Sequence, residues 1–100
     1  MNPAPSLYSN MYHVYLLRSK KDKSFYIGYT GDLDKRLKEH NTGLVNYTSK
    51  FKPWSLVYYE GYISLLDAQR REKALKSFGK SYANLKLRIK ESLNTKEGAG

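Results

Sequence analysis

The sequence contains no cysteine among its 100 residues. Disulfide bonds and thiolate metal sites are therefore excluded, and this absence fits a reducing compartment such as the cytoplasm. Long apolar runs are also missing, because no stretch approaches the ~20 apolar residues of a membrane-spanning helix. The N-terminus lacks the basic segment and apolar stretch of a signal peptide. We therefore expect a cytoplasmic protein with no membrane partner.

Acidic residues are scarce, with 9 Asp and Glu against 18 Lys and Arg, which gives a net charge of +9. Such an excess indicates a polyanionic partner, most often nucleic acid, although a lysine-rich solvated surface is the alternative interpretation. Aromatic residues are abundant, with ten tyrosines, three phenylalanines and one tryptophan among the basic residues. This mixture suits phosphates and bases, and it also fills small cores.

The length is sufficient for one domain with a modest core. Periodicity and turn residues predict strands at 12–18, 25–30 and 54–62, helices at 31–41, 64–78 and 81–93, and a loop at 43–53. Outside the single domain (11–93) we expect a flexible leader or expression remnant (1–10) and a disordered tail (94–100). The predicted fold is α+β, a small three-stranded antiparallel sheet flanked by about three helices in the order ββαβαα.

The first two strands form a predicted hairpin in which Arg18 lies opposite Phe25. Tyr15 then lies opposite Gly28, and Leu17 opposite Tyr26, so these four residues share one face with Thr30. The other face carries Val14, Leu16, Phe25, Ile27 and Tyr29, and we expect it to be the core face. On this register Gly28 leaves space beside the ring of Tyr15.

Two helices carry polar residues at unusual positions. At about 100° per residue, Glu72 falls between Leu65 and Ala68, inside the apolar stripe of the helix at 64–78. Either it pairs with an arginine across the edge of the core, or it faces a cleft where it can hold a hard cation such as Mg²⁺. Arg36 and His40, at positions i and i+4, project to the edge of the buried face of the first helix. Taken alone, they also fit a surface arginine and a hydrogen-bonded histidine at the edge of the core.

The ends of the helix at 64–78 carry recognisable signals. Ser64 with Asp67 resembles a capping box, and Gly79 is expected to end the helix.

The tripeptides HVY (13–15) and YIG (26–28), separated by ten residues, resemble the signature of the GIY-YIG nuclease superfamily. Arg36 on the helix after YIG and Glu72 on the helix after the third strand extend this resemblance. The segments NYTSKFKPWSLVYYE and AQRREKALK are similar to the small single-domain bacterial branch, the UPF0213-like proteins. The resemblance covers about residues 12–90.

The resemblance implies a site with named roles. Tyr15 and Tyr26 would be active-site tyrosines, and Gly28 the structural glycine beside them. Arg36 would contact the scissile phosphate, His40 would be a polar member of the site, and Glu72 would be the sole protein ligand of one Mg²⁺ or Mn²⁺ ion. Two departures stand out: His13 replaces the first glycine of the signature, and the asparagine that follows the glutamate in relatives is matched only by order, at Asn84.

The implied activity is hydrolysis of DNA phosphodiester bonds, in DNA repair or recombination, with single-stranded or branched substrates favoured. Arg36 would neutralise the phosphate, and Tyr15, as a phenolate favoured by nearby cations, is preferred over Tyr26 as the general base. Sequence-independent contacts to the DNA backbone are expected from Lys50, Lys52, Arg70, Arg71 and Lys76. The alternatives are a non-catalytic nucleic-acid-binding module and a nuclease subunit that needs a protein partner for targeting. Under the nuclease hypothesis, Tyr15, Tyr26, Arg36 and Glu72 should converge on one concave surface.

Overall fold

The computed structural model describes residues 10–94, which form three strands and five helices in the order ββααβααα. The predicted leader and tail therefore lie almost entirely outside the described residues. The elements are β1 (Tyr12–Ser19), β2 (Phe25–Thr30), α1 (Leu33–Thr42), α2 (Asn46–Ser49), β3 (Trp54–Tyr62), α3 (Leu65–Lys76), α4 (Lys80–Arg88) and α5 (Lys90–Asn94). In this described part of the chain, no helix has the length and apolar character needed to cross a membrane.

The three strands form one antiparallel sheet in the order β2-β1-β3, with β1 in the centre. The predicted α+β class is confirmed, and so is the hairpin register, because Tyr15 pairs with Gly28 and Leu17 with Tyr26. Between Leu16 and Leu17 the pairing with β3 shifts by one residue, which marks a β-bulge.

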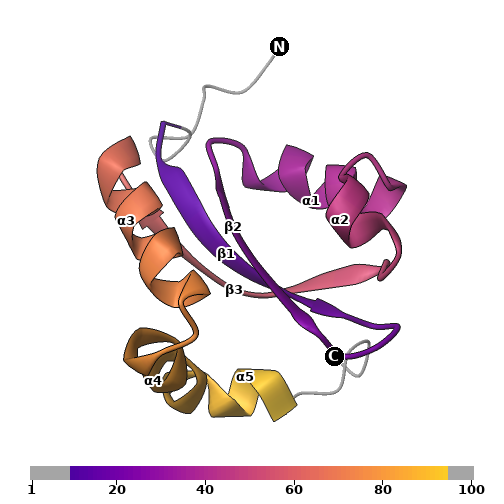
Figure 1. Cartoon of the computed structure of the whole chain (residues 1–100). Helices are drawn as coiled ribbons and strands as arrows, with labels where there is room; N and C mark the ends of the chain where they lie inside the picture. Colours follow the sequence, from indigo (N-terminus) through magenta and orange to yellow (C-terminus); the bar gives the residue numbers. More distant parts are fainter. Residues whose placement is uncertain (1–9, 95–100) are drawn as a thin grey trace.

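Helices cover both faces of this sheet, which Figure 1 shows nearly edge-on between α1 and α2 on one side and α3, α4 and α5 on the other. The face covered by α3, α4 and α5 carries the larger apolar core. It is built from Val14, Leu16 and Ile27 of the sheet with Ala68, Leu75 and Leu85 of α3 and α4. This is the expected core face. Tyr29, which we placed on it, is 36% exposed because it lies on the edge strand β2.

The opposite face of the sheet, which carries Tyr15, is also buried, and no sequence pattern indicated this second core. Tyr15, Leu17 and Trp54 form a second core there, packed against Leu33, Leu37 and Phe51. Four consecutive residues of β1, 14–17, are buried because helical layers cover both sides of this central strand. The short helix α2, in a segment predicted to be a loop, belongs to the second layer.

Local signals explain most helix ends. Asp32 caps α1 by accepting from the N–H of Lys35, and Gly43 ends it with φ 83. Ser64 caps α3 by accepting from the N–H of Asp67, as predicted. The left-handed residue after α3 is Phe78 (φ 56) rather than Gly79 (φ −92), so the predicted role of Gly79 is wrong.

The predicted last helix is divided into α4 and α5 at Ile89, whose φ of −110° and ψ of 24° are not helical. The break turns α5 back under the sheet, where Ile89 and Leu93 pack against the first core. A continuous amphipathic stripe in the sequence gives no signal for such a bend.

Candidate active site at the edge of β2

Tyr15 lies at the centre of the candidate site. It is 2% exposed, and its ring lies over Gly28 on the neighbouring edge strand. A Cβ atom at Gly28 would lie 2.5 Å from the Tyr15 hydroxyl oxygen and 2.7 Å from Cζ. Any side chain would therefore displace the phenol, and the glycine is required by close approach rather than by its backbone angles.

The Tyr15 hydroxyl is hydrogen-bonded to a buried histidine. Its oxygen lies 2.9 Å from Nε2 of His40, and Nδ1 of His40 lies 2.8 Å from Oγ1 of Thr48. Thr48 itself donates to the carbonyl of Val45, so its oxygen is free to accept from Nδ1–H. The neutral imidazole then presents the Nε2 lone pair, and Tyr15 donates its proton to it.

Burial controls the protonation of both groups. It lowers the pKa of His40 to about 4, with Arg36 adding to the decrease, so the imidazole is neutral at neutral pH. Burial also raises the pKa of Tyr15 to about 12, although the Arg36 guanidinium opposes this. The expectation that nearby cations favour the phenolate is therefore wrong for the protein alone, because desolvation outweighs Arg36.

Arg36 lies beside this pair on α1. Its positive charge opposes the rise that burial causes in the pKa of the Tyr15 phenol. Its Nη1 also lies 3.1 Å from Oε1 of Glu39, and about a third of the side chain remains exposed. A hollow of ≈ 390 Å³ opens next to it between the end of β2 and α1. Arg36 is thus held at the protein surface with donors available to an incoming anion.

Tyr26 extends the site along β2 as part of an aromatic cluster. Its ring centroid lies 4.8 Å from that of His40, 6.1 Å from that of Tyr47 and 6.2 Å from that of Trp54. The Nζ of Lys76, from α3, lies 5.6 Å from the same ring. Tyr26 therefore contacts groups from both helical layers at the edge of the sheet.

Glu72 reaches this edge from the opposite layer. Helix α3 covers the face of Val14, not that of Tyr15, yet Gln69 donates to the hydroxyl of Tyr29 and Lys76 lies over Tyr26, both on β2. The Glu72 carboxylate lies 3.3 Å from Lys76 and contributes to the raised pKa of Tyr15.

Glu72 does not form the alternative ion pair with an arginine across the edge of the core. Glu60 forms such a pair instead, with Arg71. Oε1 of Glu60 accepts from Nε of Arg71 at 2.6 Å. Glu72, by comparison, pairs with Lys76 one turn further along its own helix, and the lysine side chain is 44% exposed. Such an exposed i,i+4 pair is weak and easily displaced.

The side chains present fit a single hard cation held by one carboxylate. Glu72 supplies a partly buried carboxylate, and the Lys76 ammonium beside it shows that a positive charge is accommodated there. Mg²⁺ commonly takes one or two protein carboxylates and completes its shell with water and substrate phosphate oxygens. A dedicated cage is not available, because residues 10–94 contain no cluster of three or more His, Asp or Glu side chains with metal-ligand geometry.

The predicted DNA-contacting residues fall in three places. Lys50 and Lys52 are exposed after α2, on the layer of Tyr15, and Lys76 lies at the site itself. Arg70 is exposed on α3, whereas Arg71 is held by Glu60 on the side of α3 that faces β3.

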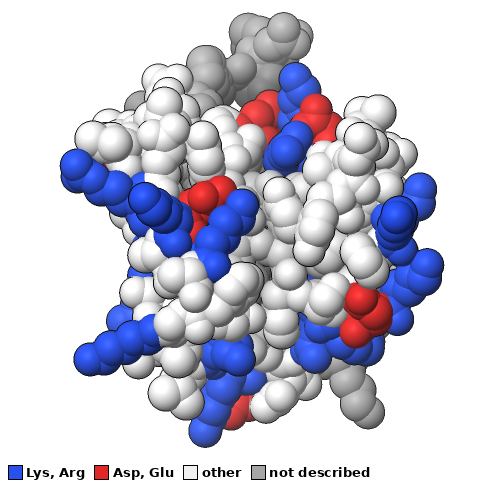
Figure 2. Space-filling model, viewed as in Figure 1, with Lys and Arg blue, Asp and Glu red and all other residues white. Residues whose placement is uncertain are grey.

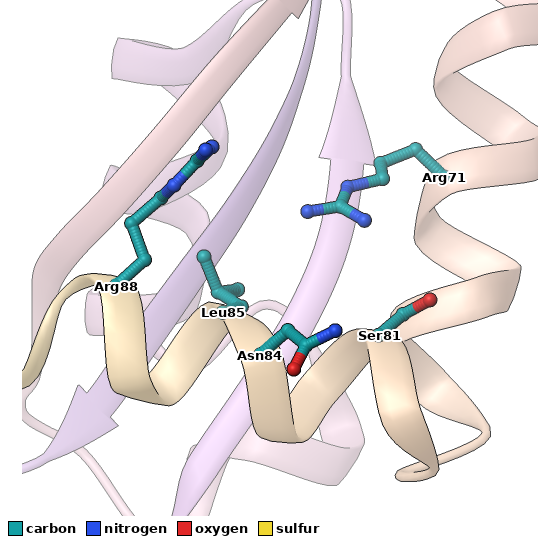
Figure 3. A pocket seen from close by; sticks show the side chains of 5 residues that line it. All are labelled: Arg71, Ser81, Asn84, Leu85 and Arg88. Atoms are coloured by element: carbon teal, nitrogen blue, oxygen red, sulfur yellow. The ribbon is translucent and has the colours of Figure 1, made fainter.

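Figure 2 shows basic side chains along both flanks of the molecule, over the α3 layer and over the α1–α2 layer, with a largely uncharged band between them. Asn84 does not join Tyr15. It lines a separate pocket with Arg71 between α3 and α4 (Figure 3).

Sequence patterns missed the residues that hold His40 in place. Thr48 is fully buried in α2, and its carbonyl accepts from the indole Nε1 of Trp54 at 2.9 Å. Asn41 joins the end of α1 to the start of β3 by bonding both the N–H and the C=O of Trp54. The segment reads as a loop from sequence because four residues are too few to show helical periodicity.

Comparison with known families matches residues 11–86 to the GIY-YIG catalytic domain. The chain therefore belongs to the GIY-YIG family, a nuclease-like superfamily, as its motifs predicted.

Within it, the similar proteins are of the UPF0213 type. One from Clostridium perfringens is 40% identical over 88 residues, covering 87% of this chain and 90% of that protein. The UPF0213 protein YazA of Bacillus subtilis is 35% identical over 86 residues, covering 85% of each chain. The solution NMR structure of a UPF0213 protein from Bacillus halodurans aligns with 90% of this chain and 99% of its own, with a TM-score of 0.52 and 31% identity.

Proposed function

We propose that this protein is a divalent-metal-dependent endonuclease that hydrolyses DNA phosphodiester bonds, with single-stranded or branched DNA as its substrate. The observation that carries the proposal is the hydrogen bond between Tyr15 and His40 over Gly28, with the Glu72–Lys76 pair of α3 next to the ring of Tyr26 on the same strand as Gly28. Family membership supports the nuclease class, and the net charge of +9 supports a polyanionic substrate.

Arg36 is proposed to bind the non-bridging oxygens of the scissile phosphate. Its guanidinium keeps its charge at any working pH and offers paired donors that match two phosphate oxygens. Glu39 holds the side chain from one side, while the rest faces the hollow beside α1. A phosphate bound there would lie on the side of α1 whose charge already acts on the pKa of the Tyr15 phenol.

Tyr15 and His40 are proposed to remove the proton from the attacking water together. With a pKa of about 12, Tyr15 has no free phenolate to offer at neutral pH. Its oxygen can still accept the proton of a water molecule if its own proton moves to Nε2 of His40 in the same step. The neutral state of His40 leaves that nitrogen able to receive it, and Thr48 holds the required tautomer.

Glu72 is proposed to hold the divalent ion, Mg²⁺ or Mn²⁺. When bound, such an ion would act as a Lewis acid on the phosphate oxygens and the leaving 3′-oxygen. Lys76, now the partner of Glu72, would be released to contact a DNA phosphate.

An exposed aromatic ring supports the preference for unpaired DNA. Tyr47 is 72% exposed beside Tyr26, with its ring also 6.5 Å from that of Phe51 and with Lys50 nearby along the chain. Exposed rings next to cationic side chains stack on bases that are not paired. We propose that Tyr47 stacks on a base beside the scissile phosphate.

Glu72→Gln separates the nuclease from its alternatives. The amide keeps the shape of the side chain and removes its charge, so Mg²⁺-supported cleavage should fall by about 1,000-fold, the equivalent of several kcal/mol. The melting temperature should stay within about 2 °C of the parent, because the ion pair that is lost joins Glu72 to a largely exposed lysine one helical turn away. Asp34→Asn is the matched control, because it removes an exposed carboxylate from a different helix, α1. It should leave cleavage unchanged.

Two outcomes would oppose the proposal. A Glu72→Gln chain that melts and cuts like the parent would remove Glu72 from the mechanism. A parent chain that binds DNA but cuts nothing with Mg²⁺ or Mn²⁺ would favour a non-catalytic binding module, or a subunit that needs a protein partner.

A further inference from the structure

A second cationic site lies far from the proposed reaction, in a cavity of ≈ 320 Å³ between α3 and α4. Arg71 lines it from α3, and Ser81, Asn84, Leu85 and Arg88 line it from α4. Figure 3 shows the two guanidinium groups reaching into the space from opposite sides, with Asn84 and Leu85 between them. Apart from Leu85, every lining side chain carries a hydrogen-bond donor.

Arg71 is already oriented for an anion. Its Nε donates to Glu60, which leaves both Nη groups directed into the cavity (Figure 3). Glu60 is itself fixed, because it accepts from the hydroxyls of Tyr58 and Tyr62 as well. A guanidinium anchored at one edge loses little freedom when its other edge binds a ligand.

Arg88 supplies positive charge that Glu60 does not neutralise. It acts on the same cluster, since burial and Glu60 raise the pKa of Tyr58 and the charge of Arg88 opposes that rise. The carboxylate of Glu60 is already bound by Arg71 and by two tyrosine hydroxyls, so it is not the partner of Arg88. Two arginines thus share one cavity with a single carboxylate whose oxygens already accept three hydrogen bonds, and the excess charge favours an anion.

We propose that this cavity, the Arg71–Arg88 pocket, binds a backbone phosphate of the nucleic acid. The chemical class of the ligand, a tetrahedral oxyanion, follows from the pocket alone, whereas its carrier rests on the proposed function. Arg71 and Arg88 each offer two donors to its oxygens, and the amide of Asn84 and the hydroxyl of Ser81 add further donors.

The position of the pocket bears on the form of the substrate. Arg71 bonds to Glu60 of β3, whereas Glu72 faces β2, so the pocket and the candidate active site lie on opposite sides of α3. A short linear strand in the active site does not extend around the helix into the pocket. A branched substrate places a second arm there, so the pocket selects forked or flapped DNA.

The test compares two single charge removals on α4. Arg88→Ala removes a pocket cation, and Lys86→Ala removes an exposed lysine that does not line the pocket. Binding of labelled forked DNA and of a short single strand is measured by fluorescence anisotropy without metal, over a series of salt concentrations. For the fork, Arg88→Ala should lower the affinity roughly tenfold and reduce the slope of log K against log salt by about 1. Lys86→Ala should change the affinity less than about twofold, and neither variant should affect the short single strand.

A second arm uses inorganic phosphate, followed by NMR at the Asn84 side-chain amide and Arg71 Nε–H. Phosphate should shift both signals in the parent and in Lys86→Ala, but only weakly in Arg88→Ala. Equal losses of fork affinity in the two variants would overturn the pocket in favour of diffuse charge. Phosphate shifts with an unchanged fork affinity in Arg88→Ala would mean an adventitious ion only.

Cleavage is scored separately, so the two proposals can fail independently. Arg88→Ala should cut a short single strand with Mg²⁺ at the parent's rate. A chain that binds the fork through Arg88 but cuts nothing would retain the pocket and lose the nuclease.

Discussion

The two faces of the sheet are buried by different chemistry. On the face of Val14 the fully covered side chains are apolar, and the polar groups Glu60 and Arg71 stay at the rim. On the face of Tyr15 lie all the buried polar residues found in residues 10–94: Ser19, His40 and Thr48. Each of them is hydrogen-bonded, which offsets the cost of burial but adds less stability than an apolar core.

This difference shows how a chain of 100 residues can have both a stable core and a candidate active site. The apolar layer of α3, α4 and α5 supplies most of the packing, and the polar layer of α1 and α2 fixes the orientation of Tyr15. The layers meet at the edge strand β2, where Lys76 of the apolar layer lies over the ring of Tyr26 and Gly28 makes room for the phenol of Tyr15.

Acid should destabilise the polar layer most. His40 has a folded pKa of about 4 against 6.5 when free, so between these values the unfolded chain binds a proton that the folded chain does not. Stability is therefore complete above pH 6.5 and falls as pH decreases toward 4, by about 3 kcal/mol in total. Urea unfolding at pH 7 and pH 4.5 measures this loss.

His40→Gln is the control, since a glutamine has no proton to take up in this range. The variant should lose clearly less stability than the parent between the two pH values, whatever its stability at pH 7. Equal losses in the two chains would show that other groups, such as Glu60, cause the acid sensitivity.

Glu60→Gln tests the rim of the apolar layer. The substitution weakens the ion pair with Arg71 and the bonds from two tyrosine hydroxyls, at a cost of about 2–3 kcal/mol. For a domain of this size the melting temperature should fall by roughly 10 °C or more. Glu72→Gln should not lower the melting temperature. Equal melting temperatures for the two variants would show that Glu60 stabilises the fold no more than Glu72 does.

Gly28→Ala tests the contact between the layers. The new methyl group would overlap the Tyr15 hydroxyl, so Tyr15 must move, at a cost of about 1–3 kcal/mol. Cleavage should fall about 10- to 100-fold at temperatures where the variant is folded, since the phenol is displaced. Gly61→Ala is the control, because its methyl group meets only the flexible end of Met11 and the ring of His13. If both variants cut at the parent's rate, the position of Tyr15 does not govern catalysis.

Tyr47→Ala should have the smallest effect on the fold, less than about 0.5 kcal/mol, because the ring is largely exposed. The affinity for single-stranded DNA should nevertheless decrease roughly tenfold through the loss of base stacking. Tyr47→Phe keeps the ring and should bind like the parent in the same anisotropy titration. A Tyr47→Ala chain that binds single strands as well as the parent would place the bases elsewhere.

The sheet could be predicted from sequence because its strands alternate and its hairpin turn is short. The same patterns indicated Tyr15 beside Gly28, and Glu72 as an off-pattern carboxylate. They did not reveal the buried second face, since tyrosines look alike whether they line a solvated site or a core. Nor did they reveal the state of the Tyr15 phenol, because desolvation depends on α1 and α2 packing over it, which no local signal encodes.

The roles that the motifs assigned to Arg36, His40 and Glu72 remain predictions, and so does that of Tyr26. Arg71 shows why such assignments need a structure. Its sequence position does not distinguish it from the other cationic residues of α3, whereas in the fold it is held by an ion pair with Glu60. Thr48 shows the opposite case, a residue with no motif that fixes the His40 tautomer through one hydrogen bond.

The measurement that tests the central claim most directly is cleavage of a labelled substrate panel by the parent chain. The panel comprises single-stranded DNA, duplex, flap and fork with an RNA strand for comparison, each assayed with Mg²⁺ or with chelator. We predict metal-dependent cutting of the single-stranded, flapped and forked DNA, weak cutting of the duplex, and none with chelator. Binding of these substrates without cutting in either Mg²⁺ or Mn²⁺, or cutting that persists in chelator and in Glu72→Gln, would contradict a metal-dependent site at the edge of β2.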